Sequence, residues 1–469
     1  MKILHHRLWP LFVLFLQFAI LFKYNDPLHI KALSQPDTKT YLEFASQHIT
    51  QALSSERTLL FPIILFIGNF FAGHLDWIPG FNHILQMMAV LIFWYGLIRY
   101  GISPWIALVG ATPLLYGEMI HYYGTSILTD SAAVSLSVST IGCLLLVVAM
   151  PKSRFIWTLW GSSLFLSYQM RPANLFLVLL CPLLGLLLSL LWRPVDRSTH
   201  TLRAWHIFKY LTIFSILPFL IFSSIRWLAV DHFGLVSFGG QNLIGITGSL
   251  IDESTVSKLP ERLQPLAKEF YQERVQRHLT PAFNDLGWIR YGPWVNEYNT
   301  NIHTIAVPLA QKFCQNNLVM ANKMLADLSI EIIKLHPKAY LRWLLAAFAD
   351  ALTVVLRHQK VTQLFLLILL PVCTLQLFFW GYRKQYPAPP TVSTTTIGDF
   401  SWELTVVGII ALLFFISGTL LVILVEPPIE RYMFATGHLL PAFFALVVLA
   451  CLGKLWSYMT GEHNALRAN

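Results

Sequence analysis

Charged residues and cysteines are both scarce in this sequence. Only 12% of the 469 residues are Asp, Glu, Lys or Arg, about half the share typical of soluble domains. Four of the five cysteines lie in apolar stretches and only Cys314 lies in the longest polar region, which excludes a disulfide framework there. CxxC and HExxH motifs, a glycine-rich phosphate loop and a Ser-His-Asp order are missing, and the histidines lack ligand spacing. A structural zinc site is therefore not expected.

Apolar runs long enough to cross about 30 Å of hydrocarbon recur along the chain instead. They are found at about 9–23, 81–99, 103–120, 131–150, 155–170, 173–192, 209–229, 362–381, 404–425 and 433–456. No small-residue cleavage site follows the first run, so it is interpreted as an uncleaved span. The sequence predicts an all-α polytopic membrane protein with about ten transmembrane helices, juxtamembrane helices and one large extracytoplasmic loop domain.

Two further apolar stretches, 58–72 and 340–356, are short and have charged edges. Such segments more often lie in the membrane interface or inside the protein than cross it. If both lie flat, the short loops rich in Lys and Arg and both termini fall on one side, which the positive-inside rule makes cytoplasmic. The net charge of +9 is attributed to this bias and to contact with membrane lipids, and no nucleic-acid partner is expected.

This topology divides the chain into three parts. Residues 1–229 form an N-terminal transmembrane module whose first loop, 24–80, faces outward. Residues 230–361 form the extracytoplasmic loop domain with its juxtamembrane helix, and 362–469 form the C-terminal transmembrane helices. The chemistry is expected on the outward face, where polar residues concentrate.

Asp37 and Asp130 are the two candidate catalytic carboxylates. Acidic residues beside apolar spans are costly and tend to be functional. Asp37 lies in the first loop with Tyr41 one turn later, and Asp130 opens a span. Both positions also suit helix capping, because exposed N–H groups at a helix start need acceptors. The topology places both carboxylates on the same face.

Arginines on that face are candidates for binding an anion. Arg171 lies between two apolar spans, and Glu430, Arg431 and Tyr432 precede the last span. Outward arginines run against the positive-inside trend, which suggests a phosphate or carboxylate partner. A snorkelling anchor at Arg171 and a local Glu430–Arg431 pair are the simpler explanations.

These features resemble the GT-C superfamily of membrane glycosyltransferases, in the branch of protein O-mannosyltransferases and the lipid A aminoarabinose transferase. The resemblance rests on the order of short motifs over nearly the whole chain: Pro36-Asp37-Thr38-Lys39-Thr40-Tyr41, the helix LLFPIILFIGNFF, Thr129-Asp130, Arg171-Pro172 and Arg431-Tyr432. The sequence departs from the family where Thr38 replaces a second acidic residue and where Met433-Phe434-Ala435 replaces a final proline motif.

The resemblance implies transfer of a sugar from a polyprenyl-phosphate donor to an acceptor hydroxyl on a lipid, glycan or protein. Asp37 would be the general base, with Asp130 assisting. Arg171, Arg431 and Arg342 would bind the donor phosphate, and Tyr41, Glu430 and Tyr432 would position substrate. No cofactor is expected, and the missing paired carboxylate argues against a divalent metal without excluding one.

The sequence also indicates where the protein is located and leaves other functions open. The large loop has no Asn-x-Ser/Thr site and no disulfide framework, which favours a bacterial inner membrane with the site facing the periplasm or cell exterior. A transporter or flippase for a lipid-linked glycan remains open, as does a non-enzymatic envelope assembly protein. A polymerase or ligase of lipid-linked glycans would share the donor chemistry.

Overall fold

A computed structural model describes residues 2–43, 49–192, 197–385 and 401–460. This part of the chain is helical and contains two isolated β-bridges but no extended strand. The first half comprises α1 (Lys2–Asn25), α2 (Thr38–Glu43), α3 (Ile49–Ser54), α4 (Leu60–Ala72), α5 (Ile78–Tyr100), α6 (Pro104–Leu115), α7 (Glu118–Tyr123), α8 (Asp130–Ala149), α9 (Arg154–Met170), the 3-10 turn η2 (Pro172–Leu175), α10 (Phe176–Leu191) and α11 (Arg197–Val230).

The second half comprises α12 (Gly239–Thr247), η3 (Gly248–Leu250), α13 (Glu253–Lys258), α14 (Gln264–Gln276), α15 (Tyr291–Asn299), the π-helical η4 (Thr300–Ala306), α16 (Val307–Phe313), α17 (Leu318–Leu335), α18 (Pro337–His358), α19 (Lys360–Gln385), α20 (Ser401–Ile423), α21 (Glu430–Thr436) and α22 (Leu440–Thr460).

Eight helices of the described chain are long and apolar enough to cross a membrane. They are α1, α5, α8, α10 with its η2 turn, α11, α18, α19 and α20; α21 and α22, which meet at 57°, would together make a ninth. The chain is therefore an all-α integral membrane protein with eight or nine candidate transmembrane helices.

Two of the ten expected spans do not meet this standard, and a third, 433–456, meets it only as the bent pair of α21 and α22. The segment 103–120 is divided between α6 and α7, and α6 alone has 12 residues, which rise only about 18 Å. The segment 155–170 forms α9, whose 17 residues rise about 25 Å. Within 103–120 the helix stops before the apolar run ends, whereas α9 fills its run and is itself short.

The segment 340–356, expected to lie flat, belongs to the 22-residue helix α18, which is counted among the candidate spans by length and composition. The other ambiguous segment, 58–72, forms the 13-residue helix α4. The expected large loop domain at 230–361 is not shown. These residues form α12–α18, and their apolar cluster includes Ile423 of α20. The Trp343 indole also donates to the Ile423 carbonyl at 3.0 Å, so α18 is joined to the transmembrane helices.

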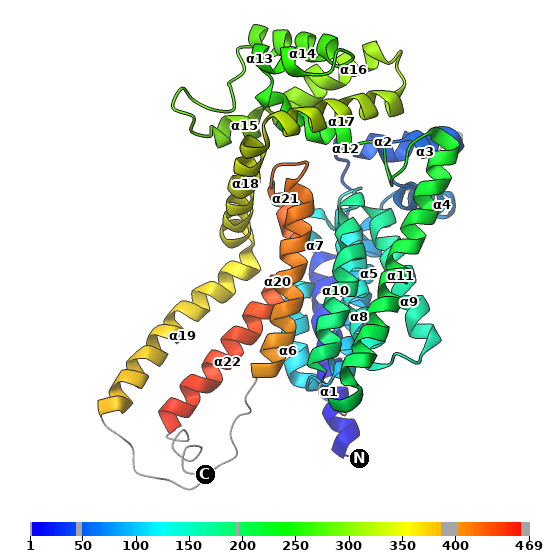
Figure 1. Cartoon of the computed structure of the whole chain (residues 1–469). Coiled ribbons are helices and arrows are strands. Elements are labelled where there is room, and N and C mark those ends of the chain that lie inside the picture. The colour runs from blue at the N-terminus through cyan, green and yellow to red at the C-terminus, as the bar shows by residue number, and fades with distance from the viewer. Residues whose placement is uncertain (1, 44–48, 193–196, 386–400, 461–469) are drawn as a thin grey trace.

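The helices form a long bundle, with α12–α17 gathered at one end and the start of α1 and the ends of α19 and α22 at the other (Figure 1). At its centre α5 packs closely against α8. A Cβ on Gly142 would lie 2.7 Å from the Phe93 backbone nitrogen, and one on Gly96 would lie 2.5 Å from the Gly142 carbonyl oxygen. Small residues allow such close helix contact inside a membrane, where packing drives association. This pair fixes α8, which carries Asp130 at its first position.

Candidate active site

The first loop is attached to the connection between α7 and α8. The Leu33 N–H donates to the Thr125 carbonyl at 2.8 Å, and the Ile127 N–H donates to the Leu33 carbonyl at 2.9 Å. The buried Thr38 hydroxyl then donates to the Ile127 carbonyl at 3.1 Å. Because Asp37 precedes Thr38 and Asp130 follows this connection, these bonds bring the two carboxylates to the same end of the bundle.

Arg431, on α21, bridges the two carboxylates. Its Nε and one terminal nitrogen donate to the two carboxylate oxygens of Asp130 at 2.8 and 2.7 Å. Its other terminal nitrogen donates to Asp37 at 3.0 Å. Arg171, between α9 and η2, also donates to Asp130, whose side chain is fully buried. The last span, the first loop and α8 therefore meet at one guanidinium.

Arg57 completes the cluster from the connection between α3 and α4. It donates to Asp37 at 3.1 Å and to the Thr40 hydroxyl at 2.9 Å. Its guanidinium also lies over the ring of Tyr41, 4.8 Å from the centroid. Sequence reasoning missed Arg57, although its place at the edge of an apolar stretch in the same outward loop was a usable signal.

The cluster pairs each positive charge with a negative one. Three guanidinium groups, of Arg57, Arg171 and Arg431, face three carboxylates, of Asp37, Asp130 and Glu56. Burial raises the pKa of Asp37, but the positive charges and hydrogen bonds of Arg57 and Arg431 outweigh that effect, so its pKa lies below its ordinary value. Asp37 is thus an anion at neutral pH. A guanidinium can exchange a carboxylate oxygen for a phosphate oxygen as its acceptor, so three arginines at one cavity suit an added anion such as phosphate.

Glu426 is a second residue that sequence reasoning missed. It lies between α20 and α21 and accepts a hydrogen bond from the amide of Asn242 on α12. Burial raises the pKa of Glu426 above its ordinary value, against the lowering effects of Tyr432 and the nearby arginines. Glu426 therefore differs from Asp37, because its pKa is shifted upward and that of Asp37 downward. Its position in VEPPIERY, just before the Arg431 motif, was the available signal.

These side chains surround one cavity of about 290 Å³, close to the lower limit of about 300 Å³ for ligand pockets. Its polar wall includes Asp37, Arg57, Arg171, Glu426 and Arg431. Its apolar wall comes from η2, α20 and neighbouring segments: Met170, Pro172, Leu175, Val236, Leu421 and Leu424. An anionic group attached to an apolar chain matches both walls.

The other expected site residues are placed as follows. Tyr41 is buried with its hydroxyl 3.5 Å from that of Thr129, and Tyr432 lies under the Arg171 guanidinium at 5.0 Å from the ring centroid. Both line the cavity. Glu430 instead pairs with His358 at 2.8 Å, and Arg342 donates to the Gly287 carbonyl at 3.0 Å. Neither Glu430 nor Arg342 lines the cavity.

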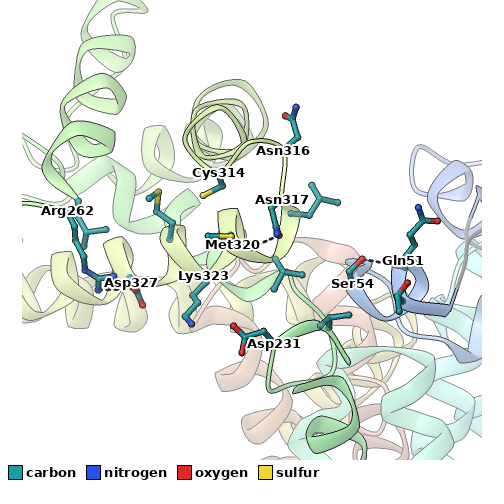
Figure 2. Close-up of a pocket in the computed structure, with 16 residues that line it drawn as sticks. Gln51, Ser54, Asp231, Arg262, Cys314, Asn316, Asn317, Met320, Lys323 and Asp327 are labelled. Carbon is teal, nitrogen blue, oxygen red and sulfur yellow. Dashed lines mark hydrogen bonds and ion pairs between the residues drawn. The ribbon is translucent and has the colours of Figure 1, made fainter. Parts of the chain in front are cut away.

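A larger cavity of about 780 Å³ is lined by α3, α17 and the end of α11 (Figure 2). Figure 2 shows Arg262 paired with Asp327 at its edge, while Lys323 and Met320 of α17 face the space. Thr50, Gln51 and Ser54 line this cavity, whereas the next residues, 56–58, line the smaller one. The larger cavity brings together none of the site residues expected from sequence.

In the described part of the chain, no group of three or more His, Cys, Asp or Glu side chains is placed to hold a metal ion. The carboxylates of the small cavity face arginines instead.

Comparison with protein-family models, with curated proteins and with solved structures finds no match to this chain. No family is thereby identified, and the functional argument rests on the geometry of the site.

Proposed function

We propose that the chain is a membrane glycosyltransferase that moves a sugar from a polyprenyl-phosphate donor to an acceptor hydroxyl on the extracytoplasmic side. The observation that carries the proposal is the small cavity. In it a partly exposed carboxylate, Asp37, lies beside three guanidinium groups and an apolar wall. These are the groups that a hydroxyl nucleophile, a phosphate leaving group and a lipid tail each require.

The guanidinium groups of Arg57, Arg171 and Arg431 are assigned to the donor phosphate. A guanidinium binds phosphate oxygens through parallel hydrogen bonds, and such charge-assisted bonds are about twice as strong as neutral ones. Arg57 and Arg431 both pair with the partly exposed Asp37, so the donor phosphate would replace that carboxylate as their acceptor. The apolar wall would receive the first part of the polyprenyl chain, because the cavity is too small for the whole lipid.

Asp37 is assigned as the general base. Its carboxylate is paired with Arg57 and Arg431, which keep its pKa low. A donor phosphate that draws these arginines away would raise the pKa of Asp37 and free its oxygens. The carboxylate would then accept the proton of the acceptor hydroxyl. Binding of the donor thus prepares the base.

In the transfer step the acceptor oxygen forms a bond to the anomeric carbon of the sugar. The bond between that carbon and the phosphate oxygen breaks, and its electron pair leaves with polyprenyl phosphate. The arginines stabilise the charge that develops on this leaving group. Asp130 has no exposed surface, so we assign it to positioning Arg171 and Arg431 rather than to contact with substrate.

The test is the release of polyprenyl phosphate from a panel of polyprenyl-phosphate sugars by the reconstituted chain, with candidate acceptors present. Asp37→Asn should lower release about 10²- to 10⁴-fold, the usual contribution of a general base. The matched control is Asp26→Asn, an exposed aspartate in the same loop that pairs with His29. Equal release by wild type and Asp37→Asn would remove Asp37 from the reaction.

A chain that binds the donors but releases nothing with any acceptor would favour the transporter or flippase. The transporter function is tested directly by assaying movement of a labelled polyprenyl-phosphate sugar across the vesicle bilayer. The non-enzymatic assembly protein would show neither release nor movement.

A further inference from the structure

A groove of about 1,040 Å³ lies between α9 and α11, away from the proposed reaction centre. Its walls are mainly apolar and aromatic, with Trp157 from α9 and Ile207, Tyr210 and Phe214 from α11. None of the described residues that line it is an Asp or Glu. These walls can therefore receive an apolar chain without placing a carboxylate against an anion.

Basic side chains gather at one end of this groove. Arg154 is exposed at the first position of α9, and Arg203 and His206 lie near the start of α11. Arg203 is already engaged, since it donates to the Val148 carbonyl at 2.7 Å and lies over the Trp192 ring at 3.8 Å. The guanidinium of Arg154 has no hydrogen-bond or ion-pair partner among the residues that the structure describes. It is available to an anion.

The basic end lies at the end of the bundle opposite the proposed reaction site. Asp130 opens α8 at the end of the proposed reaction site, and α8 has 20 residues, which rise about 30 Å. Arg154 follows the far end of that helix after a short turn. The groove thus begins about one membrane thickness from the carboxylate cluster.

Along α11 the groove is long enough to hold an acyl chain through one leaflet. Its lining runs from Leu202 to Pro218 on that helix, a rise of about 24 Å. Along α9 it runs from Arg154 to Ser162, a rise of about 12 Å. The hydrocarbon of one leaflet is about 15 Å thick, half of the bilayer core.

We infer that the groove between α9 and α11 is a binding site for an anionic phospholipid. An acyl chain lies along the aromatic wall, and the headgroup phosphate lies against Arg154 with His206 close by. A zwitterionic lipid fits the apolar wall equally well but gains less from the basic end, so the site selects lipid by charge. This inference does not depend on the proposed reaction.

Gly161 offers a way to fill the groove without disturbing the fold. It lines the groove, and a Cβ added there would meet no atom within 4 Å. A phenylalanine at this position would occupy the space of the acyl chain, whereas Arg154→Gln removes only the charge. Lys152→Gln is the matched control, because Lys152 is an exposed cation two residues from Arg154 that does not line the groove.

The purified full chain is incubated with equal amounts of phosphatidylglycerol and phosphatidylcholine. The amount of each lipid retained after gel filtration is quantified by mass spectrometry. Wild type and Lys152→Gln should retain phosphatidylglycerol preferentially. Arg154→Gln should lower its retention about fivefold, the effect of one basic residue near an anionic lipid surface. Gly161→Phe should lower retention of both lipids at this site.

Equal retention of the two lipids by wild type would overturn the inference, as would an Arg154→Gln chain that matches Lys152→Gln. If the Arg154→Gln variant elutes as aggregate, lipid retention by the Gly161→Phe variant tests the inference instead. Retention unchanged from wild type in that variant would show that no acyl chain occupies the groove.

Discussion

Arg431 forms a bidentate hydrogen-bonded ion pair with Asp130, although the two residues are 301 positions apart in the chain. The same guanidinium also reaches Asp37 with its remaining nitrogen. One side chain of α21 therefore sets the distance between the first loop and the start of α8. The planar fork of arginine allows this, because it offers donors in several fixed directions at once.

Arg431→Lys should fail to replace arginine despite keeping the charge. An ammonium group is a compact donor that cannot hold both oxygens of Asp130 and still reach Asp37. We expect the apparent KM for the polyprenyl-phosphate donor to rise at least about tenfold, as for loss of one charge-assisted bond. Titration of the donor measures it, with Arg277→Lys as control because that arginine pairs only locally with Glu273. An unchanged donor KM would separate Arg431 from the phosphate.

Asp130→Asn should destabilise the protein strongly. Asp130 is fully buried between Arg171 and Arg431, and removal of one partner from a buried ion pair typically costs about 3–5 kcal/mol. Thermal unfolding of the detergent-solubilised chain, followed by intrinsic fluorescence, should show a lower transition temperature. The double variant Asp130→Asn/Arg171→Gln should recover part of the loss, because one unpaired guanidinium is removed as well. The exposed Asp285→Asn is the control, and a stability loss no larger than in that variant would contradict the prediction.

Arg57→Gln should move the pH dependence of transfer to higher pH. In the wild type the pKa of Asp37 lies below its ordinary value of 3.8 because Arg57 and Arg431 outweigh the effect of burial. The activity carried by ionised Asp37 is therefore present above that value and lost as pH falls through the lower folded pKa. Removal of one positive neighbour should raise the pKa, and with it the acid limb of the pH–rate profile, by about one unit. An acid limb that stays in place would show that another group limits the rate.

Glu426→Gln should stabilise the protein increasingly as pH rises. The folded-state pKa of Glu426 is raised above its ordinary value of 4.5, mainly by burial. The stability linked to its neutral form is present below that value and lost as pH rises through the folded pKa. A glutamine remains neutral, so its transition temperature should match wild type near pH 4 and exceed it near pH 8. The exposed Glu261→Gln should show no such trend. If the difference in transition temperature between Glu426→Gln and wild type does not change with pH, the raised pKa of Glu426 does not affect stability.

Prediction of the spans from sequence succeeded where a helix fills the apolar run. The runs at 81–99 and 131–150 correspond to α5 and α8. It failed at 103–120, where the backbone turns between α6 and α7 at Tyr116 and Gly117 and the run is divided. Apolar composition indicates that a segment is removed from water. The length of a helix also depends on where its backbone hydrogen bonding ends.

The sequence by itself determined that this chain is an all-helical membrane protein, because transfer of apolar residues out of water is a local and nearly additive property. It also identified Asp37, Asp130, Arg171 and Arg431 as unusual, since charge beside a span is expensive wherever it occurs. Only the tertiary structure decided which of the charged residues meet. It added Arg57 and Glu426 to the cavity and left Arg342 on the Gly287 carbonyl, because the distance between side chains far apart in the chain depends on which helices pack against one another.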